Sequence, residues 1–145
     1  VIGDGPDRKQ LARQADETGV VGQVTFEGKL TGKALAAELA RHRVMIVPSR
    51  YEEPFGIVAL EGLASGCVPV VSERGGLTDA IGGHGFTFPN GDAEALADRL
   101  EGILSDIETA RHCLDGVDRH LAQCKARAVA QNYIAVFDQR LRRRT

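Results

Sequence analysis

The chain has 145 residues, of which 43% are apolar, and this is enough to bury a sizeable core in one compact domain. Its formal net charge of -2 excludes a general electrostatic attraction to nucleic acid or anionic lipid. We therefore expect a single folded domain over residues 1–145 that binds no nucleic acid.

The first third of the chain alternates between strand and helix patterns. Val1-Ile-Gly3 resembles the end of a strand, and because position 1 is not Met we expect the natural protein to begin earlier. Pro6 suits the first position of a helix, and Gly19 suits a helix end. The patterns predict helices at about 7–18 and 33–42, a strand at 24–26, and a fully buried, all-apolar strand at 44–47.

The same alternation continues to residue 91. We expect a loop at 49–53, a helix at about 56–64, a strand at 68–71, a turn at 75–76, a short helix near Ala80, a strand at 86–88 and a turn at 89–91. Strands separated by helices of this length connect through right-handed crossovers, which gives a parallel sheet covered on both faces. The sequence thus predicts an α/β fold with a doubly wound, Rossmann-like parallel sheet.

The pattern after Asp92 is helical only. Two apolar stripes recur at helical spacing, one formed by Leu96, Leu100, Ile103 and Leu104, the other by Val129, Tyr133, Val136 and Phe137. We expect both stripes to pack in the core. The basic end Arg140-Leu-Arg-Arg-Arg-Thr145 is expected to be a solvated helix end, because cations suit helix C-termini.

The segment after residue 47 carries the chemistry. In an open parallel sheet, ligands bind at the carboxyl ends of strands, where the next helix presents unsatisfied N–H groups. Pro54 can open that helix, and Gly56 lets backbone approach a ligand closely. The amides of Phe55, Gly56 and Ile57 are therefore expected to point toward an anion such as a diphosphate.

Two carboxylates flank these amides in Glu53-Pro-Phe-Gly-Ile-Val-Ala-Leu-Glu61. Glu53 would compete with a phosphate at the helix start, so it is better explained if it faces neutral sugar hydroxyls. Glu61 can accept hydrogen bonds from a vicinal diol such as a ribose, each worth about 1.5 to 3 kcal/mol. The spacing is also compatible with two solvent-facing acids. A hydrolytic pair is disfavoured, because eight helical residues span about 12 Å, beyond the roughly 5 to 9.5 Å that such pairs need.

Short motifs follow one another along nearly the whole chain. They are Gly3-Asp-Gly-Pro6, Val24-Thr-Phe-Glu-Gly28, Val47-Pro-Ser49, Glu53-x7-Glu61, Ala64-Ser-Gly-Cys-Val-Pro-Val-Val71, Gly75-Gly76 and Phe88-Pro-Asn-Gly-Asp92. This ordered set resembles glycosyltransferase family 4. The resemblance implies a retaining enzyme with the GT-B fold, two Rossmann-like domains facing a cleft. The present chain is similar to most of the C-terminal, donor-binding domain with its C-terminal helices.

The resemblance implies a role for individual residues along an NDP-sugar. These roles are base binding by the backbone of Leu30, ribose binding by Glu61, phosphate and ribose binding near Val58, sugar and diphosphate binding by the backbone of Phe55, Gly56 and Ile57, and a catalytic, sugar-binding role for Glu53. It implies no cofactor and no metal, since the NDP-sugar is a substrate.

Other parts of the family pattern are not in this sequence. The family's phosphate-binding Arg and Lys, its acceptor site and its usual catalytic His or Asp belong before Val1. We expect the missing N-terminal acceptor domain to be the partner of this chain. Without that domain the chain would be inactive. Any peripheral membrane association is expected to be made through the same domain. Ser65-Gly-Cys-Val68 is one residue longer than the commoner turn, and Glu52 is a second acid beside Glu53.

Other chemistry-bearing residues indicate no separate site. The three cysteines, Cys67, Cys113 and Cys124, are odd in number and show no C-x-x-C spacing, which fits a reducing cytoplasm. Cys67 is expected to pack behind the strand at 68–71. The histidines lack metal-ligand spacing, and His84, in a Gly-rich turn, is a lesser candidate for ligand contact. Gly3-x-Gly5 does not continue as a dinucleotide motif, because Arg8 replaces the third glycine.

The sequence therefore predicts the donor-binding domain of a cytoplasmic transferase that moves a hexose from an NDP-sugar to a glycan, lipid or small molecule. Two alternatives stay open. One is a nucleotide-sugar epimerase of the same fold, which needs no acceptor. The other is a non-catalytic nucleotide-sugar-binding module.

Overall fold

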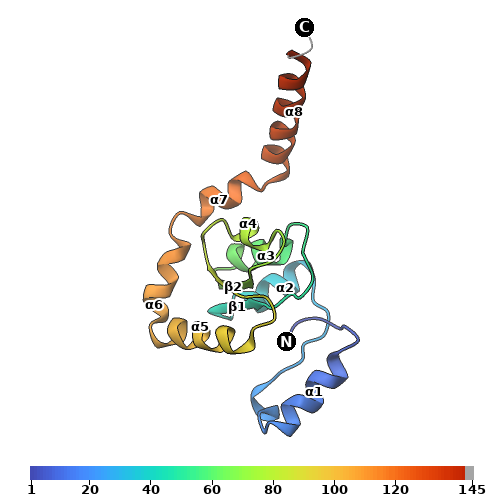
Figure 1. Cartoon of the computed structure of the whole chain (residues 1–145), viewed down its shortest axis with the longest axis vertical. Coiled ribbons are helices and arrows are strands. Elements are labelled where there is room, and N and C mark those ends of the chain that lie inside the picture. Colours follow the sequence, from blue (N-terminus) through green and yellow to red (C-terminus); the bar gives the residue numbers. More distant parts are fainter. Residues whose placement is uncertain (143–145) are drawn as a thin grey trace. The chain divides into compact units, whose positions relative to one another are not determined.

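The computed structural model describes residues 1–142, which form parts of two compact units, Val1–Glu38 and Leu39–Thr145 (Figure 1). In the first unit, helix α1 (Arg8–Glu17) matches the predicted helix to within a residue at each end. A 3-10 turn, η1 (Val21–Gln23), follows it. Helix α2 (Gly32–Leu39) ends three residues before the predicted boundary, where the amide of His42 bonds to the carbonyl of Leu39.

The strand predicted at 24–26 is wrong. Val24 has an extended backbone, but residues 24–27 form no strand, and a single parallel bridge joins Ile2 to Gly28. Backbone bonds from Glu27 to the Val1 carbonyl (3.0 Å) and from Gly3 to the Gly28 carbonyl (2.7 Å) flank that bridge. The apolar pattern is present, but a strand also needs a partner, and here the partner is only the first three residues.

The second unit is built on a three-stranded parallel sheet in the order β1-β2-β3. The strands are β1 (Val44–Val47), β2 (Val68–Ser72) and β3 (Phe86–Phe88), so all three predicted strands of this region are confirmed. The central strand β2 is buried along its whole length. Val47 lies opposite Val71, and Ser72 lies opposite Phe88, so the carboxyl ends of the three strands lie together at one end of the sheet.

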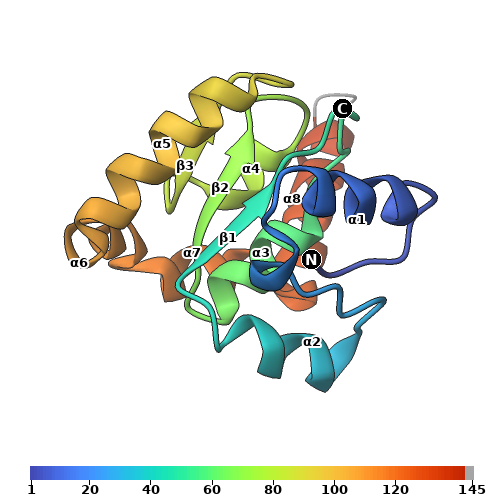
Figure 2. The same ribbon diagram turned by 90° about the horizontal axis from the view of Figure 1, so that it is seen from below.

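Helices cover both faces of this sheet, as the doubly wound fold predicts. Val71 of β2 packs with α3 (Ile57–Ala64) and α4 (Leu77–Ile81), whereas its neighbour Val70 packs with α5 (Ala93–Ser105) and α6 (Ile107–Ala110). Alternate residues of a strand point to opposite faces, which divides the core into these two clusters. The views in Figure 1 and Figure 2 show α3 and α5 on opposite sides of the strands.

Strand β1 is less buried than its sequence predicts. Only Val47 is buried, Val44 and Met45 are half-buried, and Ile46 is 42% exposed. The prediction of a fully buried strand is wrong because, within its unit, β1 pairs with β2 alone and is therefore an edge strand.

The chain ends in helices, as predicted: η2 (Arg111–Leu114), α7 (Val117–Gln123) and α8 (Ala126–Arg142) follow α6. The packing predicted for their apolar stripes is only partly right. In α5, Ile103 is buried but Leu104 is 61% exposed. In α8 no residue is buried, and Phe137 is 63% exposed.

The second stripe is exposed because the main neighbour of α8 within residues 1–142 is the short helix α7 rather than a face of the sheet. The last three residues of the predicted basic helix end, 143–145, lie outside the described residues. None of the helices within residues 1–142 is both long and apolar enough to cross a membrane.

Candidate functional site

A polar residue stands at or just after the carboxyl end of each strand: Ser49 after β1, Ser72 at the end of β2, and Asn90 after β3. The Ser72 hydroxyl donates to the carbonyl of Ser49 at 2.7 Å, and the Asn90 side-chain amide donates to the same carbonyl at 2.9 Å. Ser72 is completely buried, so this bond satisfies a hydroxyl that water does not reach. One carbonyl therefore ties the three strand ends together.

Glu53 lies close to this junction and is held at two points. Its side chain is half-buried, and its Oε1 accepts a hydrogen bond from the Ser49 hydroxyl at 3.3 Å. Its backbone carbonyl accepts from the amide of Gly76 at 2.6 Å. Glu53 is thus held at its carboxylate by Ser49, two residues after β1, and at its backbone by the loop that follows β2.

The loop after β2 approaches the Glu53 segment so closely that it requires glycine. A Cβ at Gly76 would lie 2.5 Å from the Pro54 carbonyl oxygen and 2.6 Å from the Cα of Phe55. Gly75 has a φ of +66°, and a Cβ there would lie 2.5 Å from the Glu53 carbonyl oxygen. The predicted turn at 75–76 therefore also acts as a backbone support for the site.

Helix α3 begins at Ile57, within one residue of the predicted boundary, but Pro54 lies in the preceding loop and does not open the helix. Gly56 is the N-cap residue, with a φ of +88°. A Cβ on Gly56 would lie 2.7 Å from Cδ2 of the buried Leu77, so close packing against α4 requires this glycine whether or not a ligand approaches it.

The start of α3 differs from the starts of α5 and α6, although α4 and α7 also have glycine N-caps, each with an acid in its first turn. Its glycine N-cap offers no side chain, and no acid occupies its first turn. Asp92 caps α5 by accepting from the amide of Ala95 at 2.9 Å, and Asp106 caps α6 by accepting from that of Thr109 at 3.1 Å. Hydrogen bonds from the side chain and backbone of Thr109 lower the pKa of Asp106. Only α3 of these three keeps its first-turn amides free of a side-chain cap, which leaves them for an anion.

Glu61 lies on the outer face of α3. It is exposed together with Ile57 and Ala64, whereas Ala59 and Leu63 on the inner face are buried. This is the three-to-four-residue spacing of one helix face.

The other predicted contact residues have mixed surroundings. Val58 is half-buried, and its side chain packs against the core cluster that includes Ala59 and Leu63. Phe55 is 43% exposed. Leu30 is half-buried and belongs to the first unit.

The neighbouring acids Glu52 and Glu53 have different partners. Arg74 donates from Nε to Glu52 Oε1 at 2.9 Å, and both side chains are exposed. Glu53 is instead held by Ser49. The structure thus distinguishes the two residues by burial and by hydrogen bonding.

The lesser candidates lie away from this edge of the sheet. His84, the lesser candidate for ligand contact, precedes β3 at the amino ends of the strands, and its Nδ1 lies 2.8 Å from the carbonyl of Cys113, so it does not lie beside Glu53. Cys67 is buried and donates to the carbonyl of Leu39 at 3.1 Å, which confirms its packing role, and burial raises the pKa of its thiol. Within residues 1–142, no three His, Cys, Asp or Glu side chains gather as metal ligands would.

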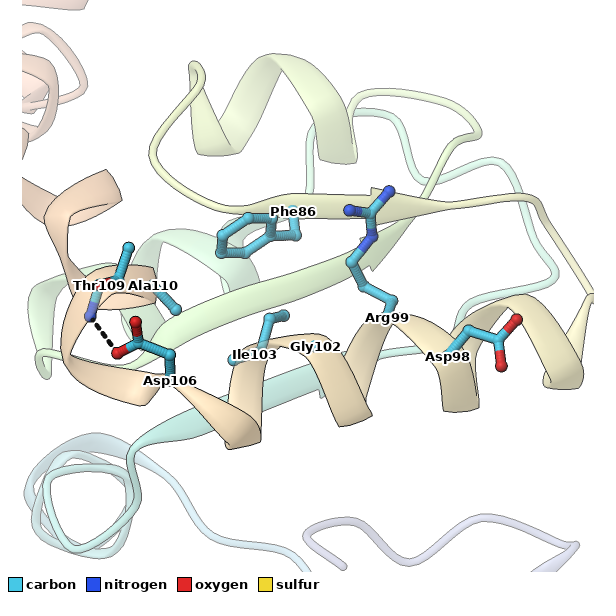
Figure 3. A pocket seen from close by; sticks show the side chains of 8 residues that line it. All are labelled: Phe86, Asp98, Arg99, Gly102, Ile103, Asp106, Thr109 and Ala110. Atoms are coloured by element: carbon cyan, nitrogen blue, oxygen red, sulfur yellow. Dashed lines mark hydrogen bonds between the residues drawn. The ribbon is translucent and has the colours of Figure 1, made fainter.

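A hollow of about 300 Å³ lies between β3 and the end of α5 (Figure 3). It is lined by Phe86, Asp98, Arg99, Gly102, Ile103, Asp106, Thr109 and Ala110. Phe86 is the first residue of β3, which places the hollow toward the amino ends of the strands, away from Glu53. Its Arg99 guanidinium sits 5.9 Å from the centre of the Phe86 ring, and Asp106 caps α6. We assign no function to this hollow.

Ser49, Ser72 and Asn90 were not predicted as site residues from the sequence. A signal was present, because each is a polar residue at the carboxyl end of one of three successive apolar strands or within two residues of it. Polar side chains at adjacent carboxyl ends of a parallel sheet are expected to meet.

Comparison with known proteins identifies relatives over most of the chain. Glycogen synthase of Mycobacterium tuberculosis is 34% identical over 142 residues, which are 93% of this chain and 34% of that protein. D-inositol 3-phosphate glycosyltransferase of Stackebrandtia nassauensis is 32% identical over 145 residues, which are 98% of this chain and 32% of that protein. The chain therefore spans about one third of the length of the curated relatives that it matches.

Solved structures agree in fold. Sucrose-phosphate synthase from Thermosynechococcus elongatus is 31% identical with a TM-score of 0.77, over 97% of this chain and 37% of that one. Anabaena HepE, solved in complex with UDP and glucose, is 20% identical with a TM-score of 0.82, over 95% of this chain and 39% of that one. Residues 1–116 match the family model described as glycosyl transferases group 1. The chain belongs to the family of group 1 glycosyl transferases, and its fold is the Rossmann-like α/β fold of their GT-B type.

Proposed function

We propose that this chain binds the NDP-sugar donor of a glycosyltransferase, and that the whole protein transfers a hexose from that donor to an acceptor. The observation that carries the proposal is the pairing of a fixed, half-buried Glu53 with the uncapped start of α3 at the carboxyl ends of the strands. This pairing offers an acceptor for hydroxyls beside donors for an anion. An NDP-sugar presents both kinds of group on adjoining atoms.

The diphosphate is assigned to the start of α3. The backbone of Phe55, Gly56 and Ile57 approaches the sugar and the diphosphate, and the backbone of Val58 lies near phosphate and ribose. The first-turn amides carry the partial positive charge of the helix, and the glycine N-cap puts no side chain in their way. Cationic side chains from the part of the protein that precedes Val1 complete the neutralisation.

Glu53 is assigned to the hydroxyls of the transferred sugar. An ionised carboxylate accepts several hydrogen bonds, so the bond from Ser49 leaves capacity for the ligand. Charge-assisted bonds of this kind contribute about 1.5 to 3 kcal/mol each. Partial burial favours such a contact, because a lower local dielectric strengthens it.

Glu61 is assigned to the ribose hydroxyls, which suits a carboxylate exposed on the outer face of α3. The backbone of Leu30 is assigned to the base. The two carboxylates would then hold the two ends of one donor, with the diphosphate between them.

We assign the reaction to glycosyltransferase family 4, with retention of configuration by front-face attack and no covalent enzyme intermediate. The α3 amides stabilise the charge that develops on the leaving diphosphate. The acceptor and the remaining catalytic groups are assigned to the N-terminal domain, through which any peripheral membrane association is made. We place the protein in the cytoplasm. Neither a cofactor nor a metal is part of this proposal, and the 145-residue chain alone is expected to be inactive.

The transfer reaction is tested on the full-length protein with a radiolabelled NDP-hexose and candidate acceptors. We expect the label to appear in a glycosylated acceptor, with NDP released in equal amount. A free epimer of the sugar as the product would overturn the transferase in favour of an epimerase. Tight donor binding without turnover on glycan, lipid and small-molecule acceptors would favour a non-catalytic binding module.

The donor itself is identified by a thermal-shift screen with UDP-, GDP- and ADP-sugars. A ligand present at 100 times its Kd stabilises the folded state by about 2.7 kcal/mol, which is a clear upward shift in Tm. We expect one nucleotide series to produce that shift. Unchanged melting with all three series at millimolar concentration would contradict the proposal.

A further inference from the structure

Ser49, in the loop just after β1, connects the Glu53 carboxylate to the carboxyl ends of β2 and β3. The Ser49 carbonyl receives the Ser72 hydroxyl at 2.7 Å and the Asn90 amide at 2.9 Å, while the Ser49 hydroxyl donates to Glu53 at 3.3 Å. A carbonyl oxygen has two lone pairs, so these two donors use its full capacity. The orientation of Ser49 is therefore fixed from both sides before its hydroxyl reaches Glu53.

We propose that Ser49, Ser72 and Asn90 are positioning residues that orient the Glu53 carboxylate toward the donor sugar and so determine how strongly the sugar adds to nucleotide binding. This inference rests on the proposed donor-binding function. It assigns Glu53 Oε1 to Ser49 and leaves Oε2 for a hydroxyl of the sugar.

The surroundings of Glu53 explain why such positioning is needed. Most of the loop between β1 and α3 is exposed, including Tyr51 at 67% and Phe55 at 43%, so the loop gains little from packing. Its attachments to the rest of the unit include the Ser49 carbonyl and the bond from Gly76 to the Glu53 carbonyl. A carboxylate on such a loop loses conformational freedom on binding unless it is already held.

Ser72 is the most deeply buried of the three positioning residues. Its side chain is 0% exposed, so neither water nor a ligand reaches it. Its hydroxyl therefore acts on the site only through the Ser49 carbonyl. A buried hydroxyl that loses its partner is costly, which keeps the bond to Ser49 formed in the folded state. The side chain that selects the sugar is thus supported by a residue that never touches it.

The test measures affinity for free NDP and for the NDP-sugar by calorimetry, on the full-length protein and its variants. Ser49→Ala is expected to leave NDP affinity within about twofold and to weaken the NDP-sugar about tenfold, because the carboxylate is no longer oriented for its charge-assisted bond to the sugar. Ser72→Ala is expected to weaken the NDP-sugar about threefold, because Asn90 still holds the carbonyl. Ser49→Thr keeps the hydroxyl and is expected to retain the wild-type ratio of the two affinities.

Thr87→Val is the matched control. It also removes a hydroxyl that donates to a carboxylate, Glu73, at 2.7 Å, and Thr87 lies in the neighbouring strand β3. It makes no bond to Ser49, so we expect the ratio of the two affinities to stay at its wild-type value. If Thr87→Val lowers the ratio of NDP-sugar affinity to NDP affinity as much as Ser49→Ala does, the positioning role of Ser49 is overturned.

A double-mutant comparison shows whether the serines act through Glu53. In a Glu53→Ala background, Ser49→Ala and Ser72→Ala are expected to have no further effect on the NDP-sugar. The inference is overturned if their losses persist in that background, if they weaken both ligands equally, or if they change neither. A wild-type protein that gains nothing from the sugar would overturn the proposed sugar contact of Glu53 as well, and this is seen before any variant is made.

Discussion

The two carboxylates of the site are positioned in different ways. Glu61 stands on a regular helix, exposed on the face that also carries Ile57. Glu53 stands in a loop, half-buried, and is held by Ser49 and Gly76. Helical geometry alone fixes the direction of Glu61, whereas Glu53 depends on contacts between segments that are distant in sequence.

This difference predicts that the two ends of the donor respond separately to mutation. A change in the loops that meet at the strand ends should reach Glu53 and leave Glu61 in place.

The largest effect is expected from Leu77→Ala. Leu77, the first residue of α4, is completely buried in the core that α4 shares with α3, and its side chain packs against Gly56 at the end of the Glu53 loop. Truncating a buried leucine costs about 2 to 5 kcal/mol of stability. Urea denaturation measures the loss, with Leu104→Ala as the control, since Leu104 is 61% exposed. Equal midpoints for the two variants would contradict the packing described here.

Glu61→Ala tests the helical end of the donor site. Loss of the ribose contact should weaken free NDP by about 1.5 to 3 kcal/mol, a factor of roughly ten or more. Calorimetry with free NDP measures it, and Glu101→Ala, which removes an exposed acid from α5, should change nothing. Unchanged NDP affinity in Glu61→Ala would count against the ribose role.

Glu53→Ala tests the loop end. It should spare free NDP and weaken the intact NDP-sugar by about 1.5 to 3 kcal/mol, because only the sugar loses a partner. The same calorimetric pair of ligands measures both values. If the two ligands lose affinity equally, Glu53 does not bind the sugar and the separation between the carboxylates fails.

Local patterns predicted the scaffold of the site well. The runs that became β1, β2 and β3 are short, apolar and bounded by turn residues, so each strand was found within one residue. The site segment was also found, because a helix that follows a strand is a local feature. Helix α3 starts within one residue of its predicted boundary, but Pro54, which suits a first helical position, lies in the loop before it.

Local patterns fail where the answer depends on a distant partner. Ser72 and Asn90 reach Ser49 across 23 and 41 residues, which no short spacing encodes. In the same way, periodicity shows that Phe137 belongs to an apolar stripe but not which element covers that stripe. Burial and hydrogen-bond partners are tertiary properties, so they followed only from the structure.

The smallest effect is expected from Gly76→Ala, which moves the loop end of the site without removing a functional group. The new Cβ would meet the Pro54 carbonyl oxygen at 2.5 Å, so the backbone must shift, at a cost of about 1 to 3 kcal/mol. Gly102→Ala is the control, because no atom lies within 4 Å of its added Cβ, and alanine is expected to stabilise that helix position slightly. Since α3 keeps its own geometry, affinity for the NDP-sugar should fall more than affinity for NDP. If Gly76→Ala instead lowers both affinities by the same factor, the loop and the helix move as one body, and Glu53 is not positioned independently of Glu61.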